Sequence, residues 1–531
     1  MKRFTHFVAC LLVLVLGGAA SAQEKMPQRW NYASANLNSD AGLKTFMDVM
    51  QQSKDVGCTH ILMPEGGWLK QADNPAYQAR VDQVQAKATE LGLTIVPCVY
   101  KIGYSGGYLG FDKNLAAGMP VKDMVFAVKG KTAVVDPAGA LDVSNVKEGA
   151  GTLKCQPFMH YRITILTSEQ PSRGEGTVQV TSQPGSRVHT RSNAQVSKQG
   201  DKWLVTTTFN SLQATDLRFS CRVKGITDLK IEPAGTLLVV RRAMCPLKVT
   251  NEDGTLTYEE GKDFVKIEDP MISGKMEGEF EDHKPADITI ADGSRIKDGD
   301  KIKVSFFHTQ RLGSDQDCIS MDDPAVFKIM ERDIVNCQKV WKPAGVFMNY
   351  DEIRLGGWEV QPDGKQLKPG ELLANHVKKG IEMIRQYAPN AKIYTWSDMF
   401  TPLHNARPFS TKGYYYLVNG NWDGAWEGLP KDVIIMNWYS PTAEGIKFFA
   451  DRGNPQVLCG YYDGTSTDAM KKNITNWMKV SQGQPQMQGF MYTTWRRNYK
   501  NLKEYFQLVD TYDQWGKGAQ AAPEKEPGVA Q

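Results

Sequence analysis

The feature that most constrains the fold of this chain is a repeated alternation of short apolar segments with longer amphipathic ones. Apolar segments rich in β-branched residues predict strands, and apolar residues at helical spacing predict helices. Such alternation is typical of parallel sheets that are covered by helices. The predicted strands cover residues 30–37, 60–64, 94–100, 345–350, 392–396, 433–438, 456–461 and 488–493.

Helix signals separate most of these strands. Leu43 to Met50 have apolar residues at helical spacing, and a second helix is predicted over 74–91. Asp323 is a suitable N-cap, because Pro324 follows it at the first helical position. A further helix is predicted over 371–388, where Pro389 ends it.

The alternation is interrupted between residues 106 and 308, where short alternating runs replace the helices. Turn signals such as Asp253-Gly254 and Asp292-Gly293 separate these runs. We therefore predict an inserted all-β region, as one sandwich-like domain or two small ones. Without it, eight strands and roughly 290 residues remain, which predicts a (β/α)8 TIM barrel interrupted after its third strand. A doubly wound open sheet is the alternative, but eight regular units favour closure.

The first 22 residues have the pattern of a secretory signal peptide. Lys2 and Arg3 precede an apolar run, and small residues end at Ala22, where we expect cleavage and export to the periplasm or the exterior. No later segment has the ~18 continuous apolar residues of a membrane span. The expected divisions are the signal peptide (1–22), the first part of the barrel (23–105), the β-rich insert (106–308), the second part of the barrel (309–517) and a disordered tail (518–531).

The net charge of +4 arises from 63 basic and 59 acidic residues, so a nucleic-acid partner is not expected. An exported chain permits disulfides, and Cys155, Cys221 and Cys245 in the β-rich region are the better candidates. The sequence has no C-x-x-C pair, no H-E-x-x-H and no nucleotide motif. We therefore expect neither a metal nor another cofactor.

Carboxylates and aromatic residues follow the predicted strands at their carboxyl ends, where a barrel of this type places its functional site. Asp351 and Glu352 directly follow the fourth strand, with Arg354 two residues on. Glu65 and Trp68 follow the second strand, but the two glycines between them are equally typical of a plain turn. The remaining candidates follow the fifth to eighth strands and are Trp396, Asp398, His404, Asn405, Trp438, Tyr461, Asp463, Tyr492 and Trp495.

This combination of residues is suited to a carbohydrate. Aromatic rings stack on the apolar face of a sugar, and cleavage of a glycosidic bond requires a carboxylic acid and a negative group. Asp351 and Glu352 can supply both, because mutual repulsion and partial burial would raise the pKa of one of them. The structural alternatives are a solvated loop for the acidic pair and core packing for the tryptophans.

These residues resemble those of family 20 glycoside hydrolases, the β-N-acetylhexosaminidases. The resemblance matches Asp351 and Glu352 to the acidic pair of that family, and Arg29 to its sugar-binding arginine. Tyr461 to Asp463 resembles a Tyr-x-Asp segment on its seventh strand. The runs Asp-Glu-Ile-Arg and Trp-Ser-Asp-Met-Phe are more similar to uncharacterised secreted bacterial barrel proteins, so the resemblance is to a divergent group. The tryptophans that resemble those of its acetamido pocket are Trp396, Trp438 and Trp495.

The resemblance implies substrate-assisted hydrolysis of β-linked N-acetylhexosaminides, with an amino-sugar glycan as the partner. Glu352 would be the general acid and base, and Asp351 would orient the acetamido group. A second hypothesis keeps Glu352 as the acid and uses Asp398 or Asp463 as nucleophile or base. A third hypothesis is a barrel that binds carbohydrate without cleaving it.

Overall fold

A computed structural model describes residues 28–512 except 173–176, 183–186, 191–193, 313–315, 408–416, 440 and 465. The predicted signal peptide and the predicted tail lie outside these residues, so both stay predictions. Within the described ranges, no helix is both long enough and apolar enough to cross a bilayer.

Eight parallel strands close into a barrel in the order β1-β2-β3-β19-β21-β23-β24-β25. The last strand pairs with the first, and Asn31 of β1 lies opposite Tyr492 of β25. The prediction of an interrupted (β/α)8 barrel is confirmed, and the open sheet is excluded. The strands are β1 (Gln28–Tyr32), β2 (His60–Met63), β3 (Thr94–Val99), β19 (Gly345–Met348), β21 (Lys392–Trp396), β23 (Ile434–Asn437), β24 (Gln456–Tyr461) and β25 (Met487–Thr493).

The predicted end of the first strand at residue 37 is wrong, because the strand stops at Tyr32. The Asn36 side chain accepts a hydrogen bond from the backbone of Asn38 at 3.3 Å and forms a turn. Ser39 then caps the following helix by accepting from the backbone N–H of Gly42. Local side-chain bonds therefore end the extended segment early.

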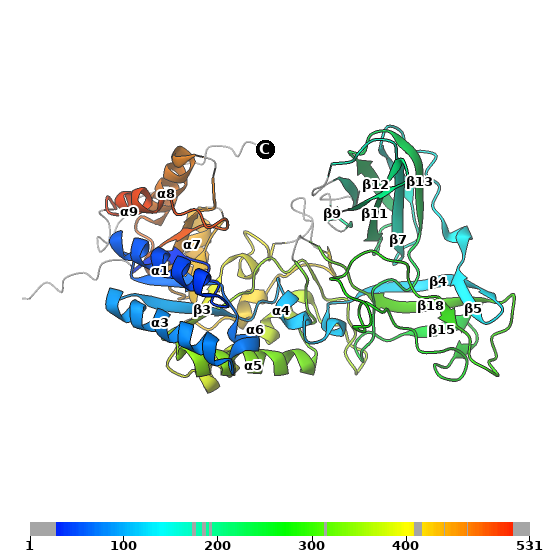
Figure 1. Cartoon of the computed structure of the whole chain (residues 1–531), viewed down its shortest axis with the longest axis horizontal. Coiled ribbons are helices and arrows are strands. Elements are labelled where there is room, and N and C mark those ends of the chain that lie inside the picture. Colours follow the sequence, from blue (N-terminus) through cyan, green and yellow to red (C-terminus); the bar gives the residue numbers. More distant parts are fainter. Residues whose placement is uncertain are drawn as a thin grey trace, which may run out of the picture.

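Helices surround the barrel, as Figure 1 shows at the left of the molecule. Asp323 accepts a hydrogen bond from the backbone of Ala325 at 2.9 Å, so the predicted N-cap of α5 is confirmed. Between β21 and β23, the only helices among the described residues are the short 3-10 helices η3 (Asp398–Phe400) and η5 (Ala425–Gly428). The α-helices of the barrel are α1 (Asp40–Asp55), α2 (Trp68–Gln71), α3 (Pro75–Leu91), α5 (Pro324–Trp341), α6 (Pro369–Tyr387), α7 (Ala443–Asp451), α8 (Thr467–Ser481) and α9 (Leu502–Val509).

Large side chains fill the interior of the barrel. Trp30, Phe347, Tyr394 and Trp396 belong to one buried cluster with the aliphatic residues of the other strands. The rings of Trp30 and Tyr394 meet edge to face at 5.0 Å. This packing makes the interior a core and leaves ligands to the carboxyl ends of the strands.

The insert separates β3 from α5 and forms three antiparallel sheets. The first residues of the insert form α4 (Gly106–Leu109) and η1 (Lys113–Leu115). The 3-10 helix η2 (Pro137–Gly139) follows β5. Two four-stranded sheets form one lobe, and the larger sheet lies below them in Figure 1. The two four-stranded sheets comprise β10 (Gln195–Gln199), β11 (Lys202–Asn210), β7 (His160–Thr167) and β13 (Ile226–Pro233), and β6 (Ala150–Lys154), β12 (Asp216–Cys221), β8 (Val178–Ser182) and β9 (Arg187–Val188).

The larger sheet of the insert has β18 and β4 at its centre. A separate pair of short strands, β20 (Leu355–Gly356) and β22 (Leu417–Val418), lies in the barrel loops. The larger sheet comprises β16 (Thr257–Tyr258), β15 (Lys248–Asn251), β18 (Lys301–His308), β4 (Met119–Lys129), β5 (Thr132–Val135) and β17 (Ile288–Thr289), with β14 (Val239–Val240) beside β18.

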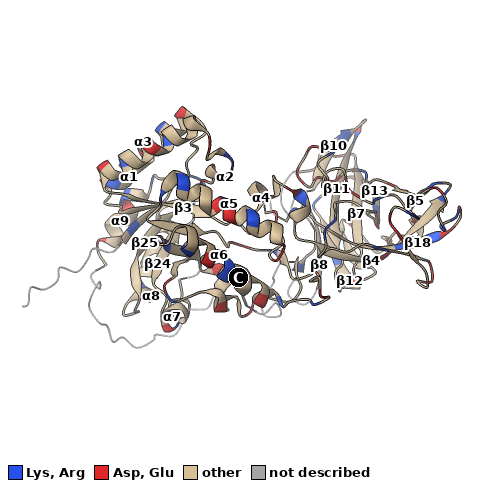
Figure 2. Ribbon diagram, turned by 90° about the horizontal axis from the view of Figure 1, so that it is seen from below, with Lys and Arg blue, Asp and Glu red and all other residues tan. Residues whose placement is uncertain are grey.

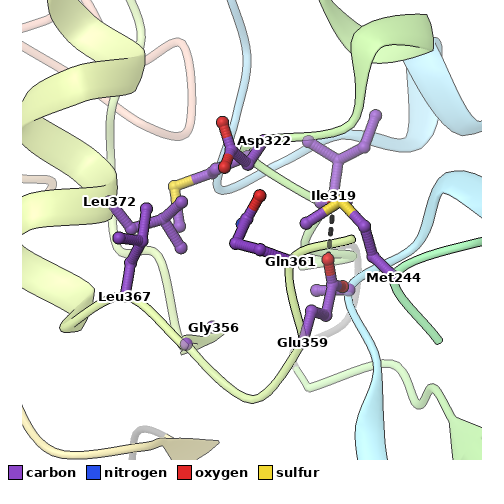
Figure 3. Close-up of a pocket in the computed structure, with 12 residues that line it drawn as sticks. Met244, Ile319, Asp322, Gly356, Glu359, Gln361, Leu367 and Leu372 are labelled. Carbon is purple, nitrogen blue, oxygen red and sulfur yellow. Dashed lines mark hydrogen bonds between the residues drawn. The ribbon is translucent and has the colours of Figure 1, made fainter. Parts of the chain in front are cut away.

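A buried ion pair joins the insert to the barrel. Arg242 of the insert pairs with Glu359 of the barrel loops. Glu359 also accepts from the backbone of Gly118 at 2.8 Å and from the Ser320 hydroxyl at 2.5 Å. Figure 3 shows Glu359 beside Met244 of the insert. Both side chains line a small pocket, whose volume is about 20 Å³. The junction is therefore packed and hydrogen-bonded.

All eight cysteines in the described ranges are unpaired, so the expectation of disulfides in the β-rich region is not met. Strand register supplies the reason for two of the candidates, Cys155 and Cys221. The backbone N–H of Cys155 bonds to Thr215, just before β12, whereas Cys221 ends β12. Six positions along a strand span about 20 Å, far beyond the reach of a disulfide. Cys245 is buried beside Arg242 and Gly118 at the junction.

Charges of both signs are interspersed along the surface helices. Figure 2 shows this for α3 and α5. The small net charge of the chain therefore reflects local mixing of acidic and basic residues, and not two separate patches in that view.

Candidate active site

The acidic residues that follow β19 and β21 meet at the carboxyl end of the barrel. The backbone N–H of Glu352 donates to Oδ2 of Asp398 at 3.0 Å. The carboxyl group of Asp351 lies close enough to Asp398 for the charge of Asp398 to raise its pKa. Adjacent strands of one barrel therefore bring together three carboxylates that are up to 47 residues apart in the chain.

Burial makes Asp351 and Asp398 unusually weak acids. Desolvation, followed by the charges of Asp398 and Glu352, raises the pKa of Asp351 well above its ordinary value. Desolvation also raises the pKa of Asp398 to about 7. Two carboxyl groups in one buried site cannot readily both ionise, so one proton is shared between them near neutral pH.

The Glu352 carboxylate is held by three donors. Its Oε2 accepts from the Tyr104 hydroxyl at 2.7 Å, from Gln316 at 2.6 Å and from Arg354 at 2.9 Å. Burial, and then the charges of Asp351 and Glu352, raise the pKa of Tyr104, so this hydroxyl stays protonated and acts as a donor. Among the described residues, every hydrogen bond to this carboxylate falls on Oε2. These bonds orient the Glu352 side chain through one oxygen. A group that must contact a ligand needs a fixed orientation of this kind.

Asp398 is positioned by the residues predicted with it. Asn405 donates to its Oδ2 at 2.7 Å, and the Trp438 indole N–H donates to its Oδ1 at 3.3 Å. His404 stacks on Tyr439 with ring centres 4.1 Å apart and meets the edge of Trp438. Burial lowers the pKa of His404 to about 3, so the imidazole is neutral at physiological pH.

Three tryptophans from different strand ends form one aromatic wall. The ring of Trp396 meets Trp438 at 6.2 Å and Trp495 at 5.8 Å, edge to face in both cases. Tyr32 at the end of β1 meets Trp495 at 5.1 Å, and Tyr462 stacks on the same tryptophan at 6.3 Å. Trp495 keeps 42% of its surface exposed and Trp438 is half-buried, whereas Trp396 is buried behind them, so the outer two rings are the ones open to a ligand.

Asp463 supports this wall. Its carboxylate accepts from the Thr494 hydroxyl at 2.5 Å, from the backbone of Trp495 and from the backbone of Arg496 at 2.8 Å. Tyr461 and Tyr492, also predicted as site residues, stack on each other at 4.8 Å, and both are buried. Their hydroxyls bond to Asn498 in the same loop. These residues therefore shape the loop that carries Trp495.

Arg29 is not brought to this group. Its guanidinium forms an ion pair with Asp510 at 2.6 Å and lies over the Phe506 ring. Neighbouring side chains on a strand point to opposite faces, and Trp30 fills the interior, so Arg29 points outward against α9. The proposed match to a sugar-binding arginine is corrected accordingly. Trp68 is likewise a core residue, since its indole donates to buried Asp333 at 2.7 Å.

Sequence reasoning missed Tyr104, Gln316 and Tyr32. Tyr32 ends β1, so the search of strand ends that found the tryptophans would also have found it. Tyr104 lies in the loop after β3, and Gln316 lies in the segment that returns from the insert. No motif marks either of these two residues, because the insert brings them together.

Backbone geometry is unusual around the site. Glu352, Tyr439, Tyr461 and Tyr462 have φ angles of 44°, 86°, 89° and 91°, which side-chain-bearing residues rarely adopt. Each such residue costs of order 1–3 kcal/mol, and strain of this kind gathers at functional sites. The loop after β3 also needs Gly103, since a Cβ there would lie 1.7 Å from the carbonyl oxygen of Asp351.

Within the described ranges, no cluster of three or more His, Cys, Asp or Glu side chains is arranged to hold a metal ion. The fold and the site together define a TIM barrel with an acidic mouth and an aromatic wall.

No family model and no curated protein matches the chain. Solved structures with some similarity include a rhamnosidase from Novosphingobium sp. PP1Y, with 10% identity and a TM-score of 0.34 over 92% of this chain. The chain spans 59% of the length of that rhamnosidase. Because the TM-scores are below 0.5, the fold is assigned from the strand pairing alone.

Two hexosaminidase structures are similar at the same level. A GH20 catalytic module of the pneumococcal exo-β-D-N-acetylglucosaminidase StrH has 8% identity and a TM-score of 0.36, covering 92% of this chain and 84% of its own. A β-N-acetylhexosaminidase from Bacteroides fragilis NCTC 9343 has 8% identity and a TM-score of 0.37, covering 93% and 68%.

Proposed function

We propose that this protein is an exported glycoside hydrolase that acts on β-linked N-acetylhexosaminides. One observation carries the proposal: Glu352 and the Asp351–Asp398 pair meet beside the tryptophan wall at the carboxyl end of the barrel. Glycosidic bond cleavage requires a carboxylic acid and a negative group, and aromatic rings beside them can stack on the apolar face of a sugar.

In the proposed mechanism, Glu352 donates its proton to the leaving oxygen as the bond from that oxygen to the anomeric carbon breaks. The carbonyl oxygen of the substrate's own acetamido group forms the new bond to the anomeric carbon. Glu352 then takes a proton from water, which attacks the same carbon and releases the acetamido group. The tryptophan wall would hold the apolar face of the sugar.

The Asp351–Asp398 pair would stabilise the positively charged cyclic intermediate. With one shared proton, the pair has a single negative charge near neutral pH. Asp351 would orient the acetamido N–H, as the family resemblance implies. The buried Oδ1 of Asp351 has no hydrogen-bond partner among the described residues, which fits a contact that a ligand completes.

A panel of chromogenic glycosides tests this proposal. It includes the 4-nitrophenyl β-glycosides of N-acetylglucosamine, N-acetylgalactosamine, glucose, galactose and rhamnose. We expect hydrolysis of at least one N-acetylated glycoside and none of the others. Silence across the panel, together with measurable binding of the same sugars, would replace hydrolysis with carbohydrate binding as the function.

A further inference from the structure

A cavity of about 550 Å³ opens beside the acidic residues, at the carboxyl ends of β2 and β3. Tyr104 lines this cavity and donates its hydroxyl to Glu352 at 2.7 Å. Cys98 of the barrel interior lines it too, so the cavity reaches the mouth of the barrel. It lies on the β3 side of Glu352, whereas the tryptophan wall begins on the β21 side.

The barrel and the insert each form part of the lining. Glu65 and Lys101 come from the loops after β2 and β3. Arg311 comes from the segment that returns from the insert, where it pairs with Asp317 at 2.9 Å and with Glu279 at 2.6 Å. This bonded group gives the insert side of the cavity a fixed shape.

The floor of the cavity is formed by Asp333, whose carboxylate already accepts three hydrogen bonds from within the protein. Both oxygens of buried Asp333 are engaged: Trp68 donates to one at 2.7 Å, and Tyr108 and the backbone of Tyr100 donate to the other at 2.6 and 3.0 Å. These bonds join α5 to the loop that carries Tyr104 and stabilise the shape of the cavity.

The barrel side keeps polar capacity. Glu65 accepts from the Tyr77 hydroxyl at 2.9 Å, and Lys101 donates to the carbonyl of Pro64. A carboxylate accepts up to about four hydrogen bonds and an ammonium donates three, so both side chains can bind a further partner. The lining holds four acidic and three basic side chains, and this small excess of acidic groups favours a neutral ligand with many hydroxyls over a polyanion.

We propose that this cavity is a second saccharide subsite, which takes a neutral, hydroxyl-rich ring joined to the sugar held at Glu352. The inference rests on the proposed function and adds that the substrate is an oligosaccharide whose second ring contacts Lys101 and Glu65. The insert forms one wall of this subsite through Arg311. The volume lies within the range of about 300–1,000 Å³ typical of small-molecule sites.

The test compares an oligosaccharide with a single-ring substrate in the full chain. The probes are N,N′,N″-triacetylchitotriose and 4-nitrophenyl N-acetyl-β-D-glucosaminide, whose nitrophenyl group has no hydroxyls to offer Lys101 or Glu65. In Lys101→Met and in Glu65→Gln, we expect kcat/KM for the trisaccharide to fall about ten-fold and kcat/KM for the aryl glycoside to stay within two-fold. Lys44→Met, on the exposed face of α1, is the matched control.

An equal fall for both substrates, or no fall for either in both variants, would overturn the second subsite. If the wild type hydrolyses neither probe, hydrolysis of N-acetylglucosaminides fails, and the subsite is tested by calorimetric binding of triacetylchitotriose. Binding that weakens about ten-fold in Lys101→Met but not in Lys44→Met would support the subsite. Absent binding, or binding that is equal in both variants, would refute it.

Discussion

The carboxyl groups of Asp351 and Asp398 lie close together in one buried site, although the two residues follow different strands of the barrel, β19 and β21. The backbone N–H of Glu352 donates to the same Asp398 side chain. The position of Glu352 thus depends on a buried acidic pair beneath it. Protonation of the pair and placement of the proposed acid are physically linked.

Replacing Glu352 by Gln should lower kcat by about 10³-fold or more on whichever N-acetylated aryl glycoside the panel identifies, because an amide cannot exchange the proton. The fold should survive, since glutamine occupies the same volume. Enzyme kinetics and circular dichroism measure the two effects. Glu371→Gln, in the first turn of α6, is the control. Unchanged turnover in Glu352→Gln would remove this residue from the role of acid.

Asp351→Asn should reduce the pH dependence of stability. Burial raises the pKa of Asp351 and of Asp398, the latter to about 7, so the folded protein binds more protons than the unfolded chain between about pH 4 and 7. The free energy of unfolding of the wild type therefore falls as pH rises through this window, by up to about 1.4 kcal/mol per pH unit for each proton.

Asparagine is neutral at every pH and can donate to Asp398, so the slope should be shallower in the variant. Urea denaturation between pH 5 and 8 measures it, with Asp48→Asn on the exposed face of α1 as the control. An Asp351→Asn slope equal to that of the wild type would contradict the shared proton.

Trp438→Ala should raise KM about ten-fold or more for N-acetylated substrates, because the aromatic wall loses its central ring. Trp426→Ala, at a ring that meets Phe448 on the outside of the barrel, controls for the general loss of a tryptophan. Michaelis–Menten kinetics on matched acetylated and non-acetylated glycosides make the comparison. Equal effects on both sugar classes would rule out an acetamido pocket.

Asp463→Ala should raise KM with less than a ten-fold change in kcat, since this carboxylate holds the backbone on both sides of Trp495. If Asp463 were the nucleophile or base, kcat would instead fall by several orders of magnitude. A double-mutant cycle with Trp495→Ala should be strongly non-additive, because both changes remove the same ring from the wall.

Glu359→Gln should destabilise the protein by about 3 kcal/mol, because it removes the nearer of the two carboxylates that pair with the buried Arg242 and leaves only Asp323, at 3.7 Å. Thermal unfolding monitored by circular dichroism measures the loss. Asp363→Asn removes an exposed partner of Lys365 nearby and should have little effect. Similar melting temperatures for the two variants would show that the junction does not depend on this pair.

The barrel was predictable because buried parallel strands are continuous apolar runs and because helix caps are local signals. Asp351, Glu352, Asp398 and Trp438 were predictable as neighbours for the same reason: parallel strands bring their carboxyl ends to one rim. The partners of Glu352 were not predictable, since Gln316 reaches it only through the path of the insert. Arg29 was misplaced because strand alternation directs its side chain outward.

The position of the insert also has a consequence for how the chain folds. Cys98 of β3 pairs with Phe347 of β19, about 250 residues later, and the barrel cannot close until this pair forms. Loop-closure entropy grows with the length of flexible chain between two contacts. An insert that folds first would shorten that flexible length to its two short connections. Early folding of the β region would therefore lower the entropic cost of closing the barrel.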